Sequence, residues 1–166
     1  MHKEVASLAR RSDSLIINPV DDVYHVSDTH FLVVMEEEGY QTFRSKYNSY
    51  KTTTDIPADI DECILIRNKK VETTDTNTQV ILQVDDHKPT RMTEYIKIDD
   101  GRDLWIYEVG DEYGFIDRRY EIFIGENAEV KSSGPLNPLM VCYDGETKAA
   151  IMPVRDLEGV DIIGFD

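Results

Sequence analysis

The chain has 166 residues, which is enough for one domain with its own hydrophobic core and too few for two of ordinary size. Apolar residues make up 40% of it and charged residues 31%, a mixture that excludes an intrinsically disordered protein. The formal net charge of −15 argues against general attraction to nucleic acid. A few cations gathered on one surface could still bind phosphates, so the placement of charge matters more than its sum.

Cysteine spacing and hydropathy narrow the class of protein further. Cys63 and Cys142 are far apart and lack the spacing of a zinc site, so we expect free, buried thiols. No apolar run approaches the roughly 18 residues that a membrane span needs, and the chain opens directly on a charged helical pattern. We therefore expect a cytoplasmic protein without a membrane partner.

The first 36 residues predict a helix followed by antiparallel strands. Good helix formers with apolar residues at helical spacing predict a helix over residues 3–11. Short segments rich in β-branched and aromatic residues, separated by turn residues, then predict strands over 14–20, 23–28 and 30–36.

Residues 39–54 contain no acidic side chain. Four aromatic residues are spaced three, four and three apart, which would place them on one face of a helix: Tyr40, Phe43, Tyr47 and Tyr50. We favour an amphipathic helix here over an irregular aromatic hairpin. Because Arg44, Lys46 and Lys51 accompany the rings, the segment is also a candidate for nucleic-acid contact, although a buried aromatic face explains it at least as well.

The rest of the chain is predicted to be mostly β-structure. Alternating segments predict strands over 62–67, 69–74, 79–84, 93–98 and 103–109. A second short helix is expected from Asp117, a good N-cap residue, to Gly125, a good terminator. Three strands then follow at 129–133, 138–143 and 148–154, with a tight turn at Asp144-Gly145 and an acidic tail over 156–166.

The sequence contains no recognisable catalytic or metal-binding motif. A metal site built from His25, His30 and Asp28 can be drawn, but in the strand interpretation these residues fall on different pieces of a hairpin. Paired aspartates occur beside turn signals, where Asp commonly bonds its own backbone. We predict a non-enzymatic protein without metal or cofactor; a small hydrolase that uses the acidic pairs and His25 or His30 is the least favoured alternative.

Two ordered segments resemble one domain of the bacterial β sliding clamps. Ser27-Asp28-Thr29-His30-Phe31-Leu32 is similar to the clamps' Thr-Asp-Gly-His-Arg-Leu strand, with Thr29 and Phe31 as departures. Tyr113-Gly114-Phe115-Ile116, the helix through Ile124 and Ile151-Met152-Pro153-Val154-Arg155 resemble the last half-domain, which ends in Met-Pro-x-Arg. The resemblance covers about residues 3–36 and 111–155.

The resemblance implies an α+β fold: a single DNA-clamp-like domain over 1–155, with antiparallel sheets, two short helices on one face, and an enlarged central region at about 37–110. The two helices would face DNA, so the candidate contacts to phosphate are their cations. These are Lys3, Arg10, Arg11, Arg118 and Arg119. Such contacts would be blind to base sequence.

In the clamps, the two motifs also contribute to a hydrophobic pocket that captures peptides of polymerases and other replication proteins. By resemblance, the candidate pocket residues here are Asp28, His30, Leu32, Met152, Pro153, Val154 and Arg155. A clamp ring contains six such domains, so a one-domain chain would need to form a homo-oligomer to encircle DNA.

Two functions of different class remain open from the sequence. The first is a non-enzymatic sliding-clamp-like protein, of a kind that a phage could encode, which binds double-stranded DNA, replication proteins or both. The second is an acidic inhibitor or mimic that keeps the fold but binds a host protein without DNA.

Overall fold

A computed structural model describes residues 1–83 and 85–155. It is an α+β fold built mostly from antiparallel strands with a few short helices, as the sequence predicts. The chain divides into two compact units, Met1–Ile81 and Leu82–Asp166. The predicted single domain over 1–155 stays a prediction, and each unit is described by itself.

The first unit contains a five-stranded antiparallel sheet in the order β5-β4-β1-β2-β3. Its strands are β1 (Ser14–Val20), β2 (Val23–Ser27), β3 (Phe31–Glu36), β4 (Ile64–Arg67) and β5 (Lys70–Thr73). Leu15 and Ile17 alternate into the core while their neighbours are less buried, which is the period of a half-buried strand. The three strands predicted before residue 37 and the two predicted at 62–74 are thus confirmed.

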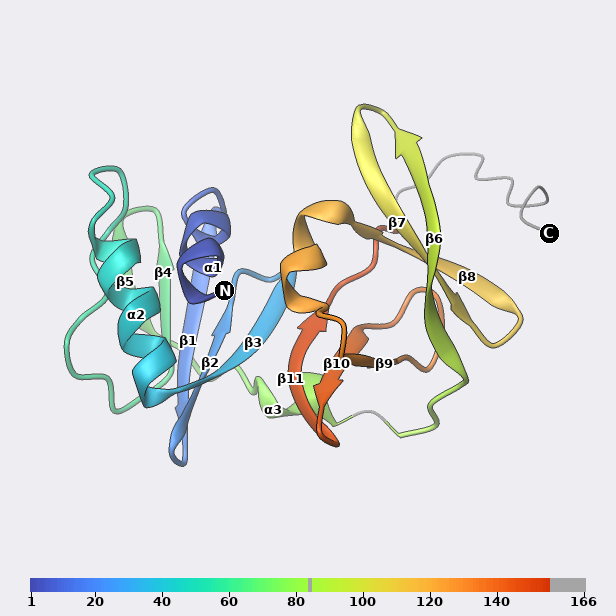
Figure 1. Cartoon of the computed structure of the whole chain (residues 1–166). Coiled ribbons are helices and arrows are strands. Elements are labelled where there is room, and N and C mark those ends of the chain that lie inside the picture. Colours follow the sequence, from blue (N-terminus) through green and yellow to red (C-terminus); the bar gives the residue numbers. More distant parts are fainter. Residues whose placement is uncertain (84, 156–166) are drawn as a thin grey trace. The chain divides into compact units, whose positions relative to one another are not determined.

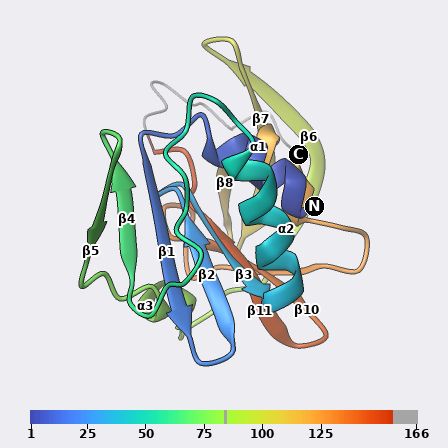
Figure 2. The ribbon, with the colours of Figure 1, turned by 90° about the vertical axis from the view of Figure 1, so that its left-hand side faces the viewer.

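Two helices in this unit pack on each other: α1 (His2–Ala9) and α2 (Glu37–Asn48). Figures 1 and 2 show them side by side, and α2 also contacts β2 and β3. Tyr40, Phe43 and Tyr47 on α2 are buried. The 3,4 spacing of these rings therefore creates a helical core face, so the helix interpretation is confirmed over the hairpin as far as Asn48. Tyr50 lies beyond the end of α2 and is half-buried.

The predicted strand at 79–84 is wrong for the residues that the structure describes. Residues Gln79–Leu82 form a short helix, α3, which begins where the Asn77 side chain accepts a hydrogen bond from the Gln79 N–H (3.1 Å). Val80 is 60% exposed. An Asn that satisfies a backbone donor in this way favours a helical turn over a strand, and local capping outweighed the β-propensity of Val and Ile.

The second unit contains two antiparallel sheets of three strands each. One has the order β6-β7-β8, with β6 (Thr90–Asp99), β7 (Arg102–Val109) and β8 (Glu112–Asp117). In the other, β10 (Leu139–Tyr143) pairs with both β9 (Glu129–Lys131) and β11 (Glu146–Ile151). The predicted turn at Asp144-Gly145 is confirmed, and both residues have positive φ (52° and 81°), as a two-residue hairpin loop requires.

The second predicted helix is present as a 3-10 helix, η1 (Arg118–Phe123). Asp117 is its N-cap, and its carboxylate accepts from the Arg119 N–H (3.0 Å). Gly125 does not terminate it through a left-handed conformation. Instead, the Gly125 N–H donates to the Tyr143 hydroxyl, which donates in turn to the Phe123 carbonyl, both at 2.8 Å. A side chain from β10 therefore holds the helix end.

Candidate nucleic-acid interface

The exposed face of α1 and α2 is the strongest candidate site in the first unit. On α1, Val5, Ala6 and Ala9 are buried, whereas Lys3 on this helix and Arg10 at its C-cap are exposed. On α2, burial of the aromatic face leaves Lys46 exposed. Amphipathic patterning thus places cations from two helices on one surface.

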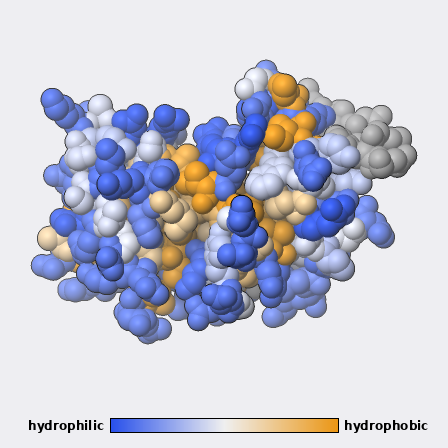
Figure 3. Space-filling model, in the orientation of Figure 1, coloured by the Kyte–Doolittle hydropathy of each residue, from blue (hydrophilic) through white to orange (hydrophobic). Residues whose placement is uncertain are grey.

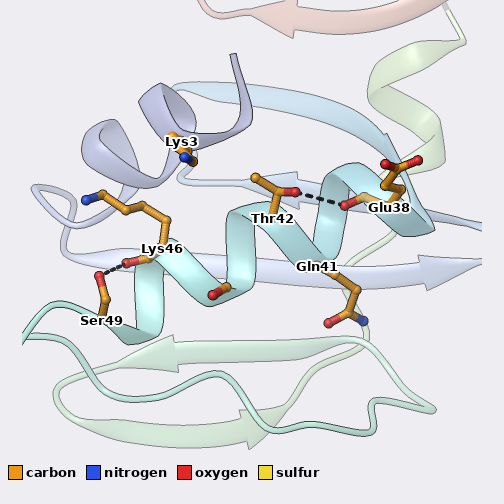
Figure 4. Close-up of a pocket in the computed structure, with 7 residues that line it drawn as sticks. Lys3, Glu38, Gln41, Thr42, Lys46 and Ser49 are labelled. Carbon is orange, nitrogen blue, oxygen red and sulfur yellow. Dashed lines mark hydrogen bonds between the residues drawn. The ribbon is translucent and has the colours of Figure 1, made fainter.

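A groove of about 740 Å³ lies on this surface. Its lining residues are Lys3, Glu38, Gln41, Thr42, Ser45, Lys46 and Ser49. Figure 4 shows Lys3 on α1 and Lys46 on α2, with Glu38 toward the other end of α2. The Ser49 hydroxyl donates to the Lys46 carbonyl (2.6 Å), so it closes the end of the helix. Hydroxyl, amide and ammonium groups in one groove suit an anionic, oxygen-rich ligand, which the exposed Glu38 carboxylate opposes.

Tyr50 organises the cations beside this groove. The Arg10 guanidinium lies 4.6 Å from the centre of the Tyr50 ring, and the Lys46 ammonium lies 5.4 Å from it. Both distances are within the range of cation–π attraction, so one ring holds charges from both helices. None of Lys3, Arg10 and Lys46 forms an ion pair with the residues that the structure describes. Their charge is therefore available to a ligand.

Two other arginines of this unit lie outside the groove and make different contacts. Arg11 is exposed at the end of α1. The Arg44 side chain instead donates to the carbonyls of Ile56 and Pro57 (3.1 and 3.2 Å), and it holds that loop against α2. Arg44 is thus a structural residue, although it belongs to the basic segment that the sequence indicates.

The two arginines predicted on the second helix lie in the second unit and are locally neutralised. Arg118 pairs with Glu121 (3.2 Å) and Asp103 (3.9 Å). Arg119 pairs with Asp117 (2.8 Å). Burial alone would raise the pKa of Asp117, but hydrogen bonds from the Arg119 side chain and backbone lower it below its usual value. These carboxylates reduce the positive potential that a phosphate would meet.

The first group of predicted pocket residues is built into the fold of the first unit. The buried Asp28 carboxylate accepts hydrogen bonds from the Ser12 hydroxyl (2.6 Å) and the backbone N–H groups of His30 (2.8 Å) and Phe31 (2.9 Å). Leu32 is 1% exposed, whereas His30 is exposed. Asp28 therefore shapes the turn between β2 and β3.

The second group lies in the second unit, after β11. The Val154 N–H donates to the Phe115 carbonyl (2.8 Å), and its side chain packs on a cluster of Leu104, Ile106 and Phe115. Pro153 is buried and Met152 is half-buried. The exposed Arg155 donates to the Leu136 carbonyl (2.7 Å). Peptide capture by these residues stays a prediction.

The histidines do not gather into a metal site in the part of the chain that the structure describes, which contains no group of three potential ligands. His25 is 4% exposed, and its Nδ1 lies 2.7 Å from the Thr78 hydroxyl. Burial lowers the pKa of His25. The acidic pairs lie at turns, where Asp21, Asp86 and Asp100 have positive φ (53°, 60° and 49°).

The chain is an α+β protein with antiparallel sheets, and the candidate interface in its first unit holds Lys3 and Lys46 together with Glu38. Comparisons with protein-family models, with curated proteins and with solved structures found no match to the chain. Among the described residues, no helix is long and apolar enough to cross a membrane.

Proposed function

We propose that this chain is a non-enzymatic, sliding-clamp-like protein that binds the phosphate backbone of double-stranded DNA through α1 and α2. The observation that carries the proposal is the arrangement of Lys3, Arg10 and Lys46 on two packed helices, without a carboxylate partner in the described residues. Three cations gathered on one face differ in sign from the net charge of −15 and create a local positive potential that could attract a phosphate. The resemblance to clamps, in which helices face DNA, agrees with this location.

The two cations beside the Tyr50 ring favour duplex DNA over single-stranded DNA as the ligand. Proteins that bind single strands stack bases on open aromatic faces. Here Arg10 and Lys46 both lie within cation–π distance of the Tyr50 ring, so the ring supports cations instead of offering a free stacking platform. Contacts through such cations carry no base-sequence information, as a clamp-like function requires.

The test is charge reversal at the interface. Arg10→Glu/Lys46→Glu should weaken binding of a 30-base-pair duplex by at least about tenfold at about 50 mM salt and should reduce the salt slope by about 2, because each phosphate contact contributes about 1. Arg67→Glu/Lys70→Glu, on exposed positions of β4 and β5, makes the same change in net charge and is the matched control.

The control variant should keep most of the affinity. An equal loss in both double variants would show that net charge alone governs binding, and would refute an interface on α1 and α2. Encirclement has a separate test, since a ring should hold nicked circular DNA and release it when the circle is linearised. Light scattering that shows a monomer at high concentration would exclude a ring.

The net charge favours a second candidate, an acidic inhibitor or mimic that binds a host protein. In that case, duplex DNA should not bind even at low salt, and a host protein should bind with an affinity that falls as acidic residues are neutralised. DNA binding that depends on Arg10 and Lys46 would argue against this candidate.

A further inference from the structure

Strand β6 of the second unit has an open edge. It pairs with β7 on one side and is an end strand of the order β6-β7-β8. On its other side, the chain just before it makes an isolated bridge between Lys88 and Ser132. From Ile96 to Asp99, beyond the register shift between Met92 and Ile96, no second strand pairs with it among the described residues. An open edge such as this one offers backbone N–H and C=O groups to another chain.

The same strand exposes apolar side chains. Ile96 is 40% exposed and Ile98 is 75% exposed, and strand alternation places them on one face of the hairpin. Ile96 pairs with Trp105, whose indole N–H donates to the Thr93 carbonyl (2.7 Å) and so fixes the ring. Figure 3 shows hydrophobic surface at this hairpin, which is the upper one in Figure 1. Adjoining exposed apolar residues of this kind mark interaction sites.

This apolar strip leads to a groove of about 620 Å³. Met92, Trp105, Ile124 and Val130 contribute apolar lining, and Trp105 belongs to both the strip and the groove. The strip and the groove therefore adjoin at Trp105, beside the open edge of β6.

The charge around the groove is negative. Glu126 and Glu129 line it and form no ion pair within the described residues. Arg91, the lining cation, makes two hydrogen bonds to the Glu108 carboxylate (2.7 and 2.9 Å), so its charge is compensated. A ligand with Lys or Arg beside its apolar side chains would match this surface.

We propose that the β6 edge and this groove capture a short, extended peptide segment of a partner protein, with apolar residues alternating with Lys or Arg. The peptide backbone adds a strand to β6, its apolar side chains cover Ile96, Ile98 and Trp105, and its cations meet Glu126 and Glu129. The chain's own residues 156–166 have four carboxylates and no Lys or Arg, and a second copy carries −15, so both have the wrong charge. This surface shares no residue with the DNA interface, and the proposal does not depend on it.

The experiment uses the full chain and a fluorescent octapeptide, Lys-Ile-Lys-Val-Lys-Ile-Lys-Val, measured by anisotropy. Two matched probes carry Glu in place of Lys, or Ser in place of Ile and Val. We expect the first peptide to bind and the other two to bind at least about tenfold more weakly. Ile96→Ser/Ile98→Ser should weaken binding at least about tenfold, because both side chains form the exposed apolar strip that the peptide covers. Glu126→Gln/Glu129→Gln should weaken it and reduce its salt dependence.

The control variant is Val71→Ser/Val80→Ser, which removes two exposed apolar side chains from the first unit (40% and 60% exposed) and should leave binding unchanged. Circular dichroism checks that each variant is folded. Absence of binding to the Lys-containing peptide at 1 mM, equal binding of the Glu-containing peptide, or equal loss in the control variant would overturn the proposal. Tighter peptide binding after removal of residues 156–166 would show that the chain's own segment occupies the surface. Dimerisation that is lost in Ile96→Ser/Ile98→Ser would show that a second copy occupies it. Either result would overturn the proposal.

Discussion

Replacement of Asp28 by Ala should cost the fold about 3 kcal/mol. The change removes a buried carboxylate that accepts three hydrogen bonds, one from Ser12 and two from the backbone of His30 and Phe31. A hydrogen bond to a charged group contributes about 1.5–3 kcal/mol, and the three are not additive because they share one acceptor group. About 3 kcal/mol is a large share of a typical unfolding free energy of about 5–15 kcal/mol.

Asp28→Asn should cost only about 1 kcal/mol. Its remaining side-chain oxygen can keep both backbone N–H groups, because Oδ1 accepts both of them in the structure. Its amide can donate to the Ser12 hydroxyl in place of the bond that Oδ2 accepts. Asp22→Ala, at an exposed position in the β1–β2 turn, is the matched control and should change stability by less than about 0.5 kcal/mol.

Urea unfolding followed by circular dichroism gives the free energies, and hydrogen exchange at the His30 and Phe31 amides gives the local effect. Both amides should exchange faster in Asp28→Ala than in Asp28→Asn. A loss below about 1 kcal/mol in Asp28→Ala, with unchanged exchange at both amides, would refute the structural role and return Asp28 to the candidates for peptide capture.

Two further measurements probe buried polar groups. His25 has a lowered pKa in the fold, so below about pH 6.5 the unfolded chain takes up a proton that the folded chain resists. The contribution of neutral His25 to stability should be fully present above this pH and be lost as the pH drops below it. The urea midpoint should therefore fall more between pH 7.5 and 5.0 in the wild type than in His25→Asn. An equal fall of the midpoint in both proteins would contradict this. Tyr107→Phe should be neutral or up to about 1 kcal/mol stabilising, because its buried hydroxyl has no hydrogen-bond partner among the residues that the structure describes. Tyr143→Phe, which loses two hydrogen bonds, should cost about 1–2 kcal/mol, and a larger cost for Tyr107→Phe would contradict the geometry.

Local patterns predicted most elements because their signals are local. The 3,4 spacing of Tyr40, Phe43 and Tyr47 has one structural solution, a helix with a buried face. At residues 79–82 the β-branched content pointed to a strand, whereas Asn77 favoured a helical turn. A four-residue segment contains too few periods for hydrophobic spacing to decide, so the cap determined the outcome.

The interface was only partly predictable, for a different reason. The sequence identified Lys3 and Arg10 on one helix and an acid-free basic segment on another. It could not show that these helices pack together, nor that Tyr50 lies beneath cations from both. It also could not separate Lys46 from Arg44, which lie two residues apart but face a groove and a loop carbonyl respectively. Pairings between segments distant in the chain depend on tertiary packing that local patterns do not encode.

A small cationic face on a strongly anionic chain has a consequence for the kinetics of the proposed DNA binding. At a distance, DNA experiences mostly the net charge of −15 and is repelled, while close to α1 and α2 it is attracted. The Debye length shortens from about 30 Å at 0.01 M salt to about 10 Å at 0.1 M, so added salt first screens the long-range repulsion. The association rate constant should therefore rise over this interval while the lifetime of the complex shortens.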